Sequence, residues 1–288
     1  MQEVQWFPGH MAKTRRMIKE NLSLVDCVAE LVDARIPQSS RNPEMDDLCA
    51  NKPRILVMTK IDLADPAATF GWIEKFRADG LFPTALDCKS GAGMKNFAPL
   101  LRTILHDKKA HDLKRGMNKA LRVLVVGIPN VGKSTFINRL AGAKRAKTEN
   151  RPGVTRGKQW VATREEFELL DTPGVLWPKF EDPAVGEKLA FAGAIKDTVL
   201  DMEELAANLL GILAPHYGAP LISRFKIKNL QAEKYSLLEQ AARGRGFLIS
   251  GGEADTQRAA NVILEEYRSG KLGRISLEWA EDTDGLAL

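Results

Sequence analysis

The sequence predicts an α/β fold, in which a mostly parallel β-sheet carries helices on both faces, followed by a small all-α domain. Over roughly the first 170 residues, short apolar runs alternate with helix-like stretches, which is typical of parallel strands joined by crossover helices. Polar motifs follow the ends of several apolar runs, and ligands of such sheets bind beyond the carboxyl ends of the strands. The C-terminal part of the chain shows helical periodicity alone.

The first half of the chain contains three of the predicted strands. An amphipathic, basic helix is expected over residues 11–24, before a buried strand at 25–31. The remaining elements of this half are strands at 54–59 and 82–87 and helices at 66–79 and 94–106. Each helix can return the chain to the start of the next parallel strand.

The second half begins with a fourth strand at 121–126 and a helix from residue 135. A pair of strands is expected at 158–162 and 166–170. Three prolines predict a mobile connector over 174–188. Beyond it, helices are expected at 199–217, 236–243 and 256–269, and the acidic C-terminus from Glu278 onward is expected to fray. We therefore expect an α/β domain over 1–178 and a helical domain over 185–288.

Composition and charge fit a globular protein in the cytoplasm. The 288 residues are 44% hydrophobic and 27% charged, with a net charge of +5. No apolar run approaches the roughly 18 residues that span a bilayer, and the N-terminus lacks a secretory apolar segment. The three cysteines have no metal-ligand spacing, so we expect reduced thiols, with Cys27 buried in a strand.

A phosphate-binding loop is the strongest motif in the chain. Residues 127–134 read Gly-Ile-Pro-Asn-Val-Gly-Lys-Ser, a complete G-x-x-x-x-G-K-S pattern between a predicted strand and a predicted helix. Backbone N–H groups of such a loop surround phosphate oxygens, Lys133 is expected to reach the β- and γ-phosphates, and Ser134 is expected to bind Mg²⁺. The nucleotide-binding residues expected here are Pro129, Asn130, Val131, Gly132, Lys133, Ser134 and Thr135. A chance glycine-rich turn would not supply the full motif in this context.

Two further segments are expected to contact the metal and the γ-phosphate. Asp171-Thr172-Pro173-Gly174 ends a predicted strand, where Asp171 can bind Mg²⁺ through water and the N–H of Gly174 can approach the γ-phosphate. Thr155 lies on a long loop that could close over Mg²⁺ when the γ-phosphate is present.

Two loops at strand ends are candidates for reading the base. In Thr59-Lys60-Ile61-Asp62, the carboxylate of Asp62 can accept hydrogen bonds from N1–H and the 2-amino group of guanine, and adenine lacks this pair of donors. Asp87-Cys88-Lys89 can present the N–H of Cys88 to guanine O6. Two points stay open. The Thr59 hydroxyl can contact guanine N7 or tether the phosphate loop, and the hydrogen bonding around Asp87 is not predictable.

The order of these motifs resembles that of the circularly permuted GTPases, because the base-reading segment precedes the phosphate loop. Trp6-Phe7-Pro8-Gly9-His10-Met11 and Asp33-Ala34-Arg35-Ile36-Pro37 narrow the resemblance to the ribosome biogenesis GTPase A family, the YlqF type, over nearly the whole chain. The resemblance implies a circularly permuted P-loop GTPase domain with a small helical domain. It also implies a GTP-hydrolysing assembly factor for the large ribosomal subunit, switched by GTP and stimulated by ribosomal RNA. GTP/GDP, Mg²⁺ and K⁺ would be its ligands, and the protein would act as a monomer without DNA or membrane partners.

The catalytic group is less evident than the binding groups. Many GTPases carry a glutamine just after Asp-x-x-Gly to orient water, whereas Val175 and Leu176 follow here. The resemblance implies that His10 acts in hydrolysis together with Lys133 and Thr155. The alternative is that His10 only caps the next helix.

The side chain of Asn130 also has two possible roles. The resemblance implies that it helps to hold K⁺ beside the β- and γ-phosphates, where the cation would neutralise charge in the transition state. The alternative is that its side chain only stabilises the turn of its own loop.

Basic residues form three clusters along the chain, in segments 102–122, 139–158 and 224–274. They are either solvated faces or contacts to RNA phosphates, and their recurrence in a nucleotide-binding protein favours structured ribosomal RNA. The helical domain over 185–288 is expected to contact RNA or the ribosome.

Two other functions compete. One is the GTPase module of an RNA-modification or tRNA-processing system, although the C-terminal part offers no cysteine nucleophile or second cofactor motif. The other is a small-molecule kinase, which would usually take ATP and would not need Asp62.

Overall fold

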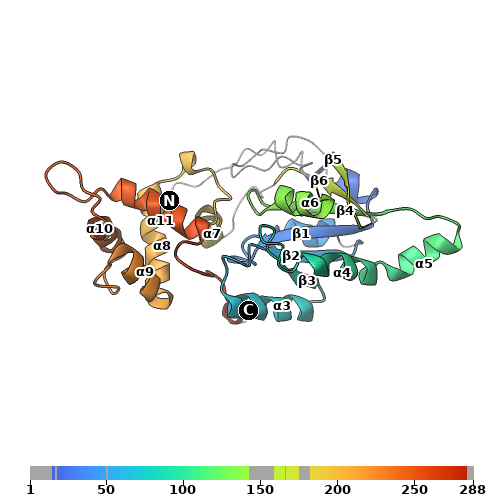
Figure 1. Ribbon diagram of the computed structural model, residues 1–288, viewed down its shortest axis with the longest axis horizontal. Helices are drawn as coiled ribbons and strands as arrows, with labels where there is room; N and C mark the ends of the chain where they lie inside the picture. The colour runs from blue at the N-terminus through green and yellow to red at the C-terminus, as the bar shows by residue number, and fades with distance from the viewer. Residues whose placement is uncertain are drawn as a thin grey trace.

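The computed structural model describes residues 15–16, 18–49, 51–142, 159–165, 167–174 and 182–283. An α/β domain and a helical domain lie side by side along the long axis of the molecule (Figure 1). The predicted fold class is therefore confirmed.

A six-stranded sheet forms the centre of the α/β domain. Its strands are β1 (Cys27–Asp33), β2 (Arg54–Thr59), β3 (Phe82–Ala85), β4 (Leu121–Gly127), β5 (Gln159–Ala162) and β6 (Phe167–Asp171). The order across the sheet is β3-β2-β1-β4-β6-β5, and all neighbours are parallel except β5 and β6. Asp33 pairs with Thr59 and Leu31 with Gly127, so the central strands end close to one another at one edge.

Helices cover both faces of this sheet. They are α2 (Glu44–Leu48), α3 (Pro66–Ala78), α4 (Phe97–Ile104), α5 (His106–Lys114) and α6 (Lys133–Ala141). Alternate residues of β1 point to opposite faces, as strand geometry requires. Ala29 and Leu31 pack with α4 and α6, whereas Val32 packs with α3 and Val28 packs with α2 and the helical segment around Ile18.

The helical domain contains α7 (Pro183–Phe191), α8 (Met202–His216), α9 (Gly218–Phe225), α10 (Lys234–Gly244) and α11 (Thr256–Ser269). Helix α8 packs against α9, α10 and α11, and its buried residues are mostly leucine and alanine. Short 3-10 turns complete the chain at Met94–Asn96, Asp197–Val199 and Ala280–Thr283.

Three sequence predictions need correction. The connector predicted over 174–188 is wrong for its last residues, because α7 begins at Pro183, where Asp182 caps the helix and proline fits the first turn. The sequence predicts no helix between residues 106 and 121, whereas α5 begins at His106; it buries none of its side chains and so has no apolar stripe to reveal it. The C-terminus does not fray at Glu278, whose side chain is buried.

Candidate nucleotide site

The phosphate loop joins β4 to α6 at the carboxyl edge of the sheet. Lys133 is buried, and its Nζ donates to the carbonyl oxygens of Gly127 at 3.0 Å and Ile128 at 2.9 Å. Burial lowers the pKa of Lys133 to about 8, although the neighbouring Asp171 opposes this shift. Ser134 and Thr135 follow in the first turn of α6, half-buried.

Asp171 is the last residue of β6 and lies close to this lysine. Burial raises the pKa of Asp171 to about 6, against the opposing effect of Lys133. Its Oδ1 atom is buried and has no hydrogen-bond partner among the described residues. A buried carboxylate oxygen of this kind is a suitable ligand for Mg²⁺ or for water bound to it, because Mg²⁺ prefers hard oxygen donors.

Gly174 lies directly against the phosphate loop. A Cβ atom at this position would stand 2.7 Å from Lys133 Nζ and 2.8 Å from the Cα of Pro129. Only glycine fits such a close approach of two backbones. Thr172, two residues before Gly174, anchors this segment by donating from its hydroxyl to the carbonyl oxygen of Val125 at 2.7 Å.

The loop after β2 is the first of the two loops that the sequence predicts to read the base. Thr59 Oγ1 lies 2.6 Å from the carbonyl oxygen of Val131 and 3.0 Å from that of Val32, so of its two predicted roles the structure has the tether to the phosphate loop. Lys60 adopts a positive φ of 58°, and its Nζ donates to Asp33 Oδ2 at 2.8 Å. The Asp62 side chain is exposed.

The Asp33-Ala34-Arg35 motif explains how Lys60 is held. Arg35 donates to both carboxylate oxygens of Asp33, at 2.9 and 2.8 Å, and both side chains are buried. Although burial opposes ionisation, Arg35 and Lys60 hold the pKa of Asp33 well below its usual range. The sequence marked this motif as part of a resemblance, but gave no signal of its contact with Lys60.

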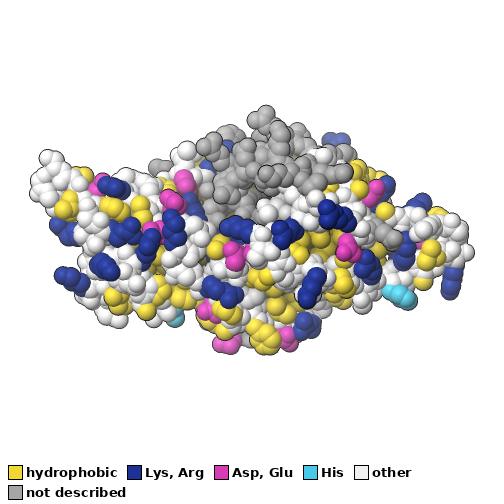
Figure 2. Space-filling model, viewed as in Figure 1, with side chains coloured by type: hydrophobic (Ala, Val, Ile, Leu, Met, Phe, Trp, Pro, Cys, Tyr) yellow, Lys and Arg dark blue, Asp and Glu magenta, His cyan; other side chains and the backbone are white. Residues whose placement is uncertain are grey.

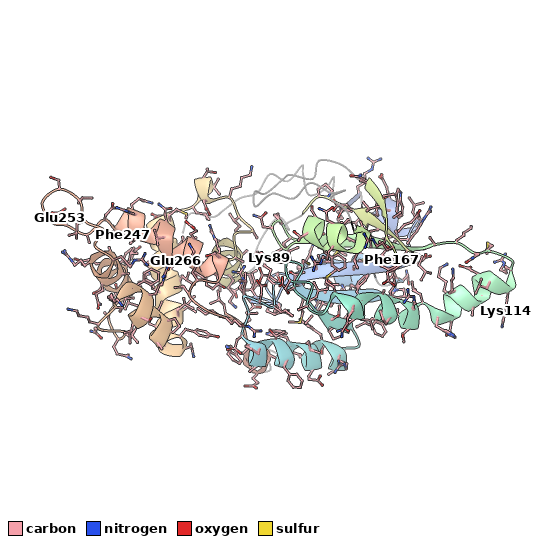
Figure 3. The ribbon with its side chains drawn as sticks, viewed as in Figure 1. Lys89, Lys114, Phe167, Phe247, Glu253 and Glu266 are labelled. Carbon is pink, nitrogen blue, oxygen red and sulfur yellow. The ribbon has the colours of Figure 1, made fainter. Side chains whose placement is uncertain are left out.

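The second base-reading loop stabilises itself. Asp87 accepts hydrogen bonds from the backbone N–H of Lys89 at 2.7 Å and of Ser90 at 2.8 Å, which answers the question that the sequence left open. The hydrogen bonds from Ser90 and Lys89 lower the pKa of Asp87 in spite of its burial. Cys88 is buried, and Lys89 is exposed at the edge that faces the helical domain (Figure 3).

Arg139 links this second loop to the phosphate helix. Its Nη2 atom donates to the carbonyl oxygen of Ser90 at 2.8 Å. The sequence shows Arg139 only as part of a basic cluster, because a contact between α6 and a loop 49 positions earlier leaves no local pattern.

Asn130 contacts the helical domain. Its backbone has a positive φ of 57°, and its Nδ2 donates to the carbonyl oxygen of Gly193 at 2.7 Å, just after α7. Its amide oxygen, Oδ1, is the atom of this side chain that could bind K⁺, because an amide nitrogen is only a hydrogen-bond donor. Of the three predicted catalytic residues, Lys133 is described above, whereas His10 and Thr155 lie outside the described residues, as do Val175 and Leu176.

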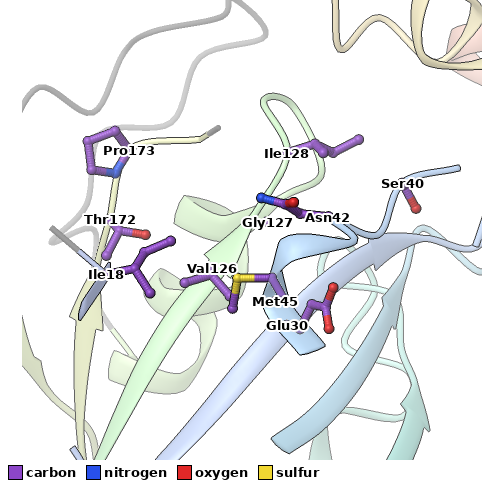
Figure 4. Close-up of a pocket in the computed structure, with 10 residues that line it drawn as sticks. All are labelled: Ile18, Glu30, Ser40, Asn42, Met45, Val126, Gly127, Ile128, Thr172 and Pro173. Atoms are coloured by element: carbon purple, nitrogen blue, oxygen red, sulfur yellow. The ribbon is translucent and has the colours of Figure 1, made fainter. Parts of the chain in front are cut away.

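A small pocket lies beneath the phosphate loop. Ile18, from the N-terminal helical segment, lines it together with Gly127, Ile128, Thr172 and Pro173 (Figure 4). The N-terminal segment therefore passes next to the phosphate-binding elements.

These elements define the class of the protein. The phosphate loop, the Asp-x-x-Gly segment and the two loops predicted to read the base converge on one edge of a mostly parallel sheet, in the arrangement of a P-loop GTPase. Both base-reading loops precede the phosphate loop in the chain, so the GTPase domain is circularly permuted.

Comparisons with known proteins give the family. A family model described as a 50S ribosome-binding GTPase matches residues 122–240. A ribosome biogenesis GTPase A of Priestia megaterium is 47% identical over 277 residues, which cover 96% of each chain. Mitochondrial ribosome-associated GTPase 1 of Mus musculus is 32% identical, over 95% of this chain and 90% of its own. The crystal structure of GNP-bound YlqF from T. maritima matches with a TM-score of 0.68 and 28% identity, over 93% of this chain and 99% of that one.

The chain belongs to the ribosome biogenesis GTPase A family. It is a guanine-nucleotide-binding, GTP-hydrolysing enzyme of ribosome biogenesis. None of the described helices is long and apolar enough to span a membrane.

Proposed function

We propose that this GTPase is a cytoplasmic, monomeric assembly factor for the large ribosomal subunit, switched by GTP and stimulated by ribosomal RNA. The observation that carries the proposal is the position of the nucleotide site. Its phosphate loop contacts the helical domain directly, through Asn130 and Gly193. A change at the γ-phosphate can therefore alter the relative position of the two domains, and with it the surface that contacts a ribosomal particle. The match of residues 122–240 to 50S ribosome-binding GTPases supports this partner.

Guanine recognition is assigned to the two loops after β2 and β3. The carboxylate of Asp62 would accept hydrogen bonds from N1–H and the 2-amino group, and the N–H of Cys88 would donate to O6. Lys60 and Lys89 would lie along the base. Asp62 is exposed, as a base-reading group needs to be, and Asp33 fixes the Nζ of Lys60. Specificity follows because adenine would leave the carboxylate without its donors.

Phosphate binding is assigned to the loop at 129–135. Lys133 would contact the β- and γ-phosphates, and the N–H of Gly174 the γ-phosphate, which is consistent with the contact between these two residues. Ser134, Thr155 and Asp171 would hold Mg²⁺, which neutralises developing charge on the phosphates when bound. The unpaired Oδ1 of Asp171 supports its part in this set.

For the hydrolytic water we propose His10. Ile18 lies beside Thr172 and Pro173 (Figure 4). Eight residues of chain span at most about 28 Å, so the length of chain before Ile18 allows His10 to act at the γ-phosphate. An imidazole there could orient or polarise the attacking water. K⁺ bound by Asn130 would neutralise charge beside the β- and γ-phosphates.

Contact with ribosomal RNA is assigned first to α5 and the segment after it. Helix α5 projects from the α/β domain and buries none of its side chains (Figure 1). Among the described residues, Lys114, Arg115 and Lys119 have no ion-pair partner. Lys114 lies at the tip of this projection (Figure 3).

The arginines of the helical domain are a weaker candidate. Lys and Arg side chains extend over the visible face of both domains (Figure 2). However, Arg224 and Arg245 pair with Glu266, and Arg268 pairs with Asp197. These charges stabilise the domain itself, so fewer of them remain for RNA phosphates.

The two competing functions are less well supported. Burial raises the pKa of both Cys27 and Cys88 to about 12, which disfavours a thiolate nucleophile for RNA modification. Within the described part of the chain, no group of three or more His, Cys, Asp or Glu side chains could hold a metal ion. A kinase has no use for a guanine-reading Asp62.

The test is GTP hydrolysis by the purified protein, with and without large ribosomal subunits, in K⁺ and in Na⁺. Stimulation by the large subunit that is greater in K⁺ is the expected result. Equal rates with and without subunits, in either salt, would remove the proposed partner and the proposed stimulation while leaving the GTPase activity in place.

A further inference from the structure

The base-reading loop after β2 is held by the far end of the chain. Residues 274–278, which we call the C-terminal strap, leave the helical domain after α11 and run along residues 60–65. Arg274 donates from Nε to the carbonyl oxygen of Ala64 and from Nη2 to that of Ile61, both at 2.9 Å. The backbone N–H of Ile275 donates to the carbonyl of Leu63 at 2.8 Å.

A fourth bond completes this contact. The N–H of Asp65 donates to Ser276 Oγ at 3.0 Å. The strap therefore contacts the backbone of the loop on both sides of Asp62, by hydrogen bonds that bridge more than two hundred positions of sequence. Since the Asp62 side chain is itself exposed, the direction of its carboxylate depends on how the loop backbone is held.

The strap is itself fixed at its other end. The N–H of Leu277 donates to the carbonyl of Arg35 at 2.8 Å, next to the Asp33 carboxylate that holds Lys60. The buried carboxylate of Glu278 accepts the N–H of Gln38 at 2.8 Å and pairs with Lys188 of α7 at 3.1 Å. One short segment thus connects the base-reading loop, the Asp33-Ala34-Arg35 motif and the helical domain.

We propose that the C-terminal strap is a specificity element for guanine, with Arg274 as its main positioning residue. Arg274 touches neither base nor phosphate; it fixes the carbonyls of Ile61 and Ala64, and thereby the Asp62 carboxylate opposite the 2-amino group. The inference rests on the proposed role of Asp62. The same hydrogen bonds would couple guanine binding to docking of the helical domain, so that each stabilises the other.

The chemistry of the base allows a sharp test. Hypoxanthine keeps N1–H and O6 but lacks the 2-amino group, so the ratio of GDP to IDP affinity reports on that group alone. We expect Arg274→Ala to weaken GDP binding by about tenfold more than IDP binding, which lowers this ratio about tenfold. Arg274→Lys, which keeps one donor, should lie between Arg274→Ala and the unchanged protein.

Arg268→Ala is the matched control. Arg268 also donates to two backbone carbonyls, of Ala190 at 2.8 Å and Phe191 at 3.1 Å, but it does not contact the base-reading loop. Arg268→Ala should therefore leave the ratio of GDP affinity to IDP affinity unchanged. Thermal melting of each variant identifies any that fails to fold, and Arg274→Lys then carries the test.

The outcomes separate the inference from the proposed function. A fall in the ratio for Arg274→Ala and for Asp62→Asn, but not for Arg268→Ala, supports both. An unchanged ratio for folded Arg274→Ala and Arg274→Lys, with a lowered ratio for Asp62→Asn, overturns the role of the strap and leaves Asp62 as the reader of the base. An unchanged ratio for Asp62→Asn overturns the assigned role of Asp62 and the strap's role with it.

Discussion

Several side chains at this site are held by ion pairs and by hydrogen bonds to backbone groups, and these contacts join residues that belong to different motifs. Lys60 illustrates the point, because its place in Thr-Lys-x-Asp does not reveal that Asp33 binds its Nζ. In the same way, the second base-reading loop is held by Arg139, which donates to the carbonyl oxygen of Ser90.

Replacing Arg139 tests the second loop independently of the first. We expect Arg139→Ala to weaken GDP and IDP binding by the same factor, about three- to tenfold, because O6 is present on both bases and the hydrogen bond lost is worth about 1 kcal/mol. Calorimetric titration with both nucleotides measures this. Arg164→Ala, which removes an exposed arginine beside Gly142 at the end of the same helix, is the control. A changed GDP to IDP ratio in Arg139→Ala would contradict the assignment.

Asp171 gives a prediction that depends on pH. Its pKa in the folded protein, about 6, is above the ordinary value near 3.8, so the folded state disfavours the ionised form. The resulting loss of stability is absent below about pH 4, grows as pH rises, and is complete above about pH 6, where it is at most about 3 kcal/mol. Asp171→Asn should therefore stabilise the nucleotide-free protein more at pH 7.5 than at pH 5.

Denaturant unfolding at the two pH values measures this difference. The same variant should need a higher Mg²⁺ concentration for half-maximal GTP hydrolysis, since an amide is a poorer ligand than a carboxylate for Mg²⁺. A variant that is less stable than the unchanged protein at pH 7.5 would show that the ionised carboxylate is favoured by its surroundings.

Among the secondary-structure elements, those with a clear periodic signal were predictable. β2 was predicted with its exact bounds and α11 likewise, because each has an unbroken apolar pattern and clear flanking residues. Helix α9 follows α8 with only Tyr217 between them, so its periodicity merges with that of α8. Helix α5 has no buried face at all, and propensity alone does not distinguish it from a basic linker.

Helix α5 is also the element whose charges are the easiest to test. Replacing Lys114, Arg115 and Lys119 by alanine should weaken binding to large ribosomal subunits and reduce the slope of log affinity against log salt by about two to three, as expected for three lost phosphate contacts. Sedimentation binding across a salt series measures both. Alanine at Arg16, Arg77 and Lys95 removes the same charge outside the basic clusters and should change the slope little. An equal effect of both triple variants would point to net charge rather than to contact through α5.

At the scale of the whole molecule, the helical domain contacts both ends of the nucleotide site. Asn130 donates from the phosphate loop to Gly193, and Arg274 of the C-terminal strap donates to the carbonyl oxygen of Ala64 in the loop after β2. The motifs in the sequence predicted that these loops lie together at the carboxyl edge of the sheet, because each loop is local and follows the end of a strand. The contacts from the helical domain were not predictable, since they join backbone carbonyls to polar side chains over long distances in the chain.

This arrangement favours a GTPase whose domain docking depends on the nucleotide. GTP would draw Gly174 and the phosphate loop together, and the phosphate loop contacts Gly193, two residues after the end of α7. The state with GTP would then be the one that fits the immature particle, and hydrolysis would release it.

Co-sedimentation with large-subunit particles, in a non-hydrolysable GTP analogue and in GDP, tests whether the nucleotide switches binding. We expect binding at least tenfold tighter with the analogue than with GDP, at a fixed salt concentration and with the unchanged protein. Equal affinity in the two nucleotide states would contradict it, because a ligand that binds both states equally cannot switch between them.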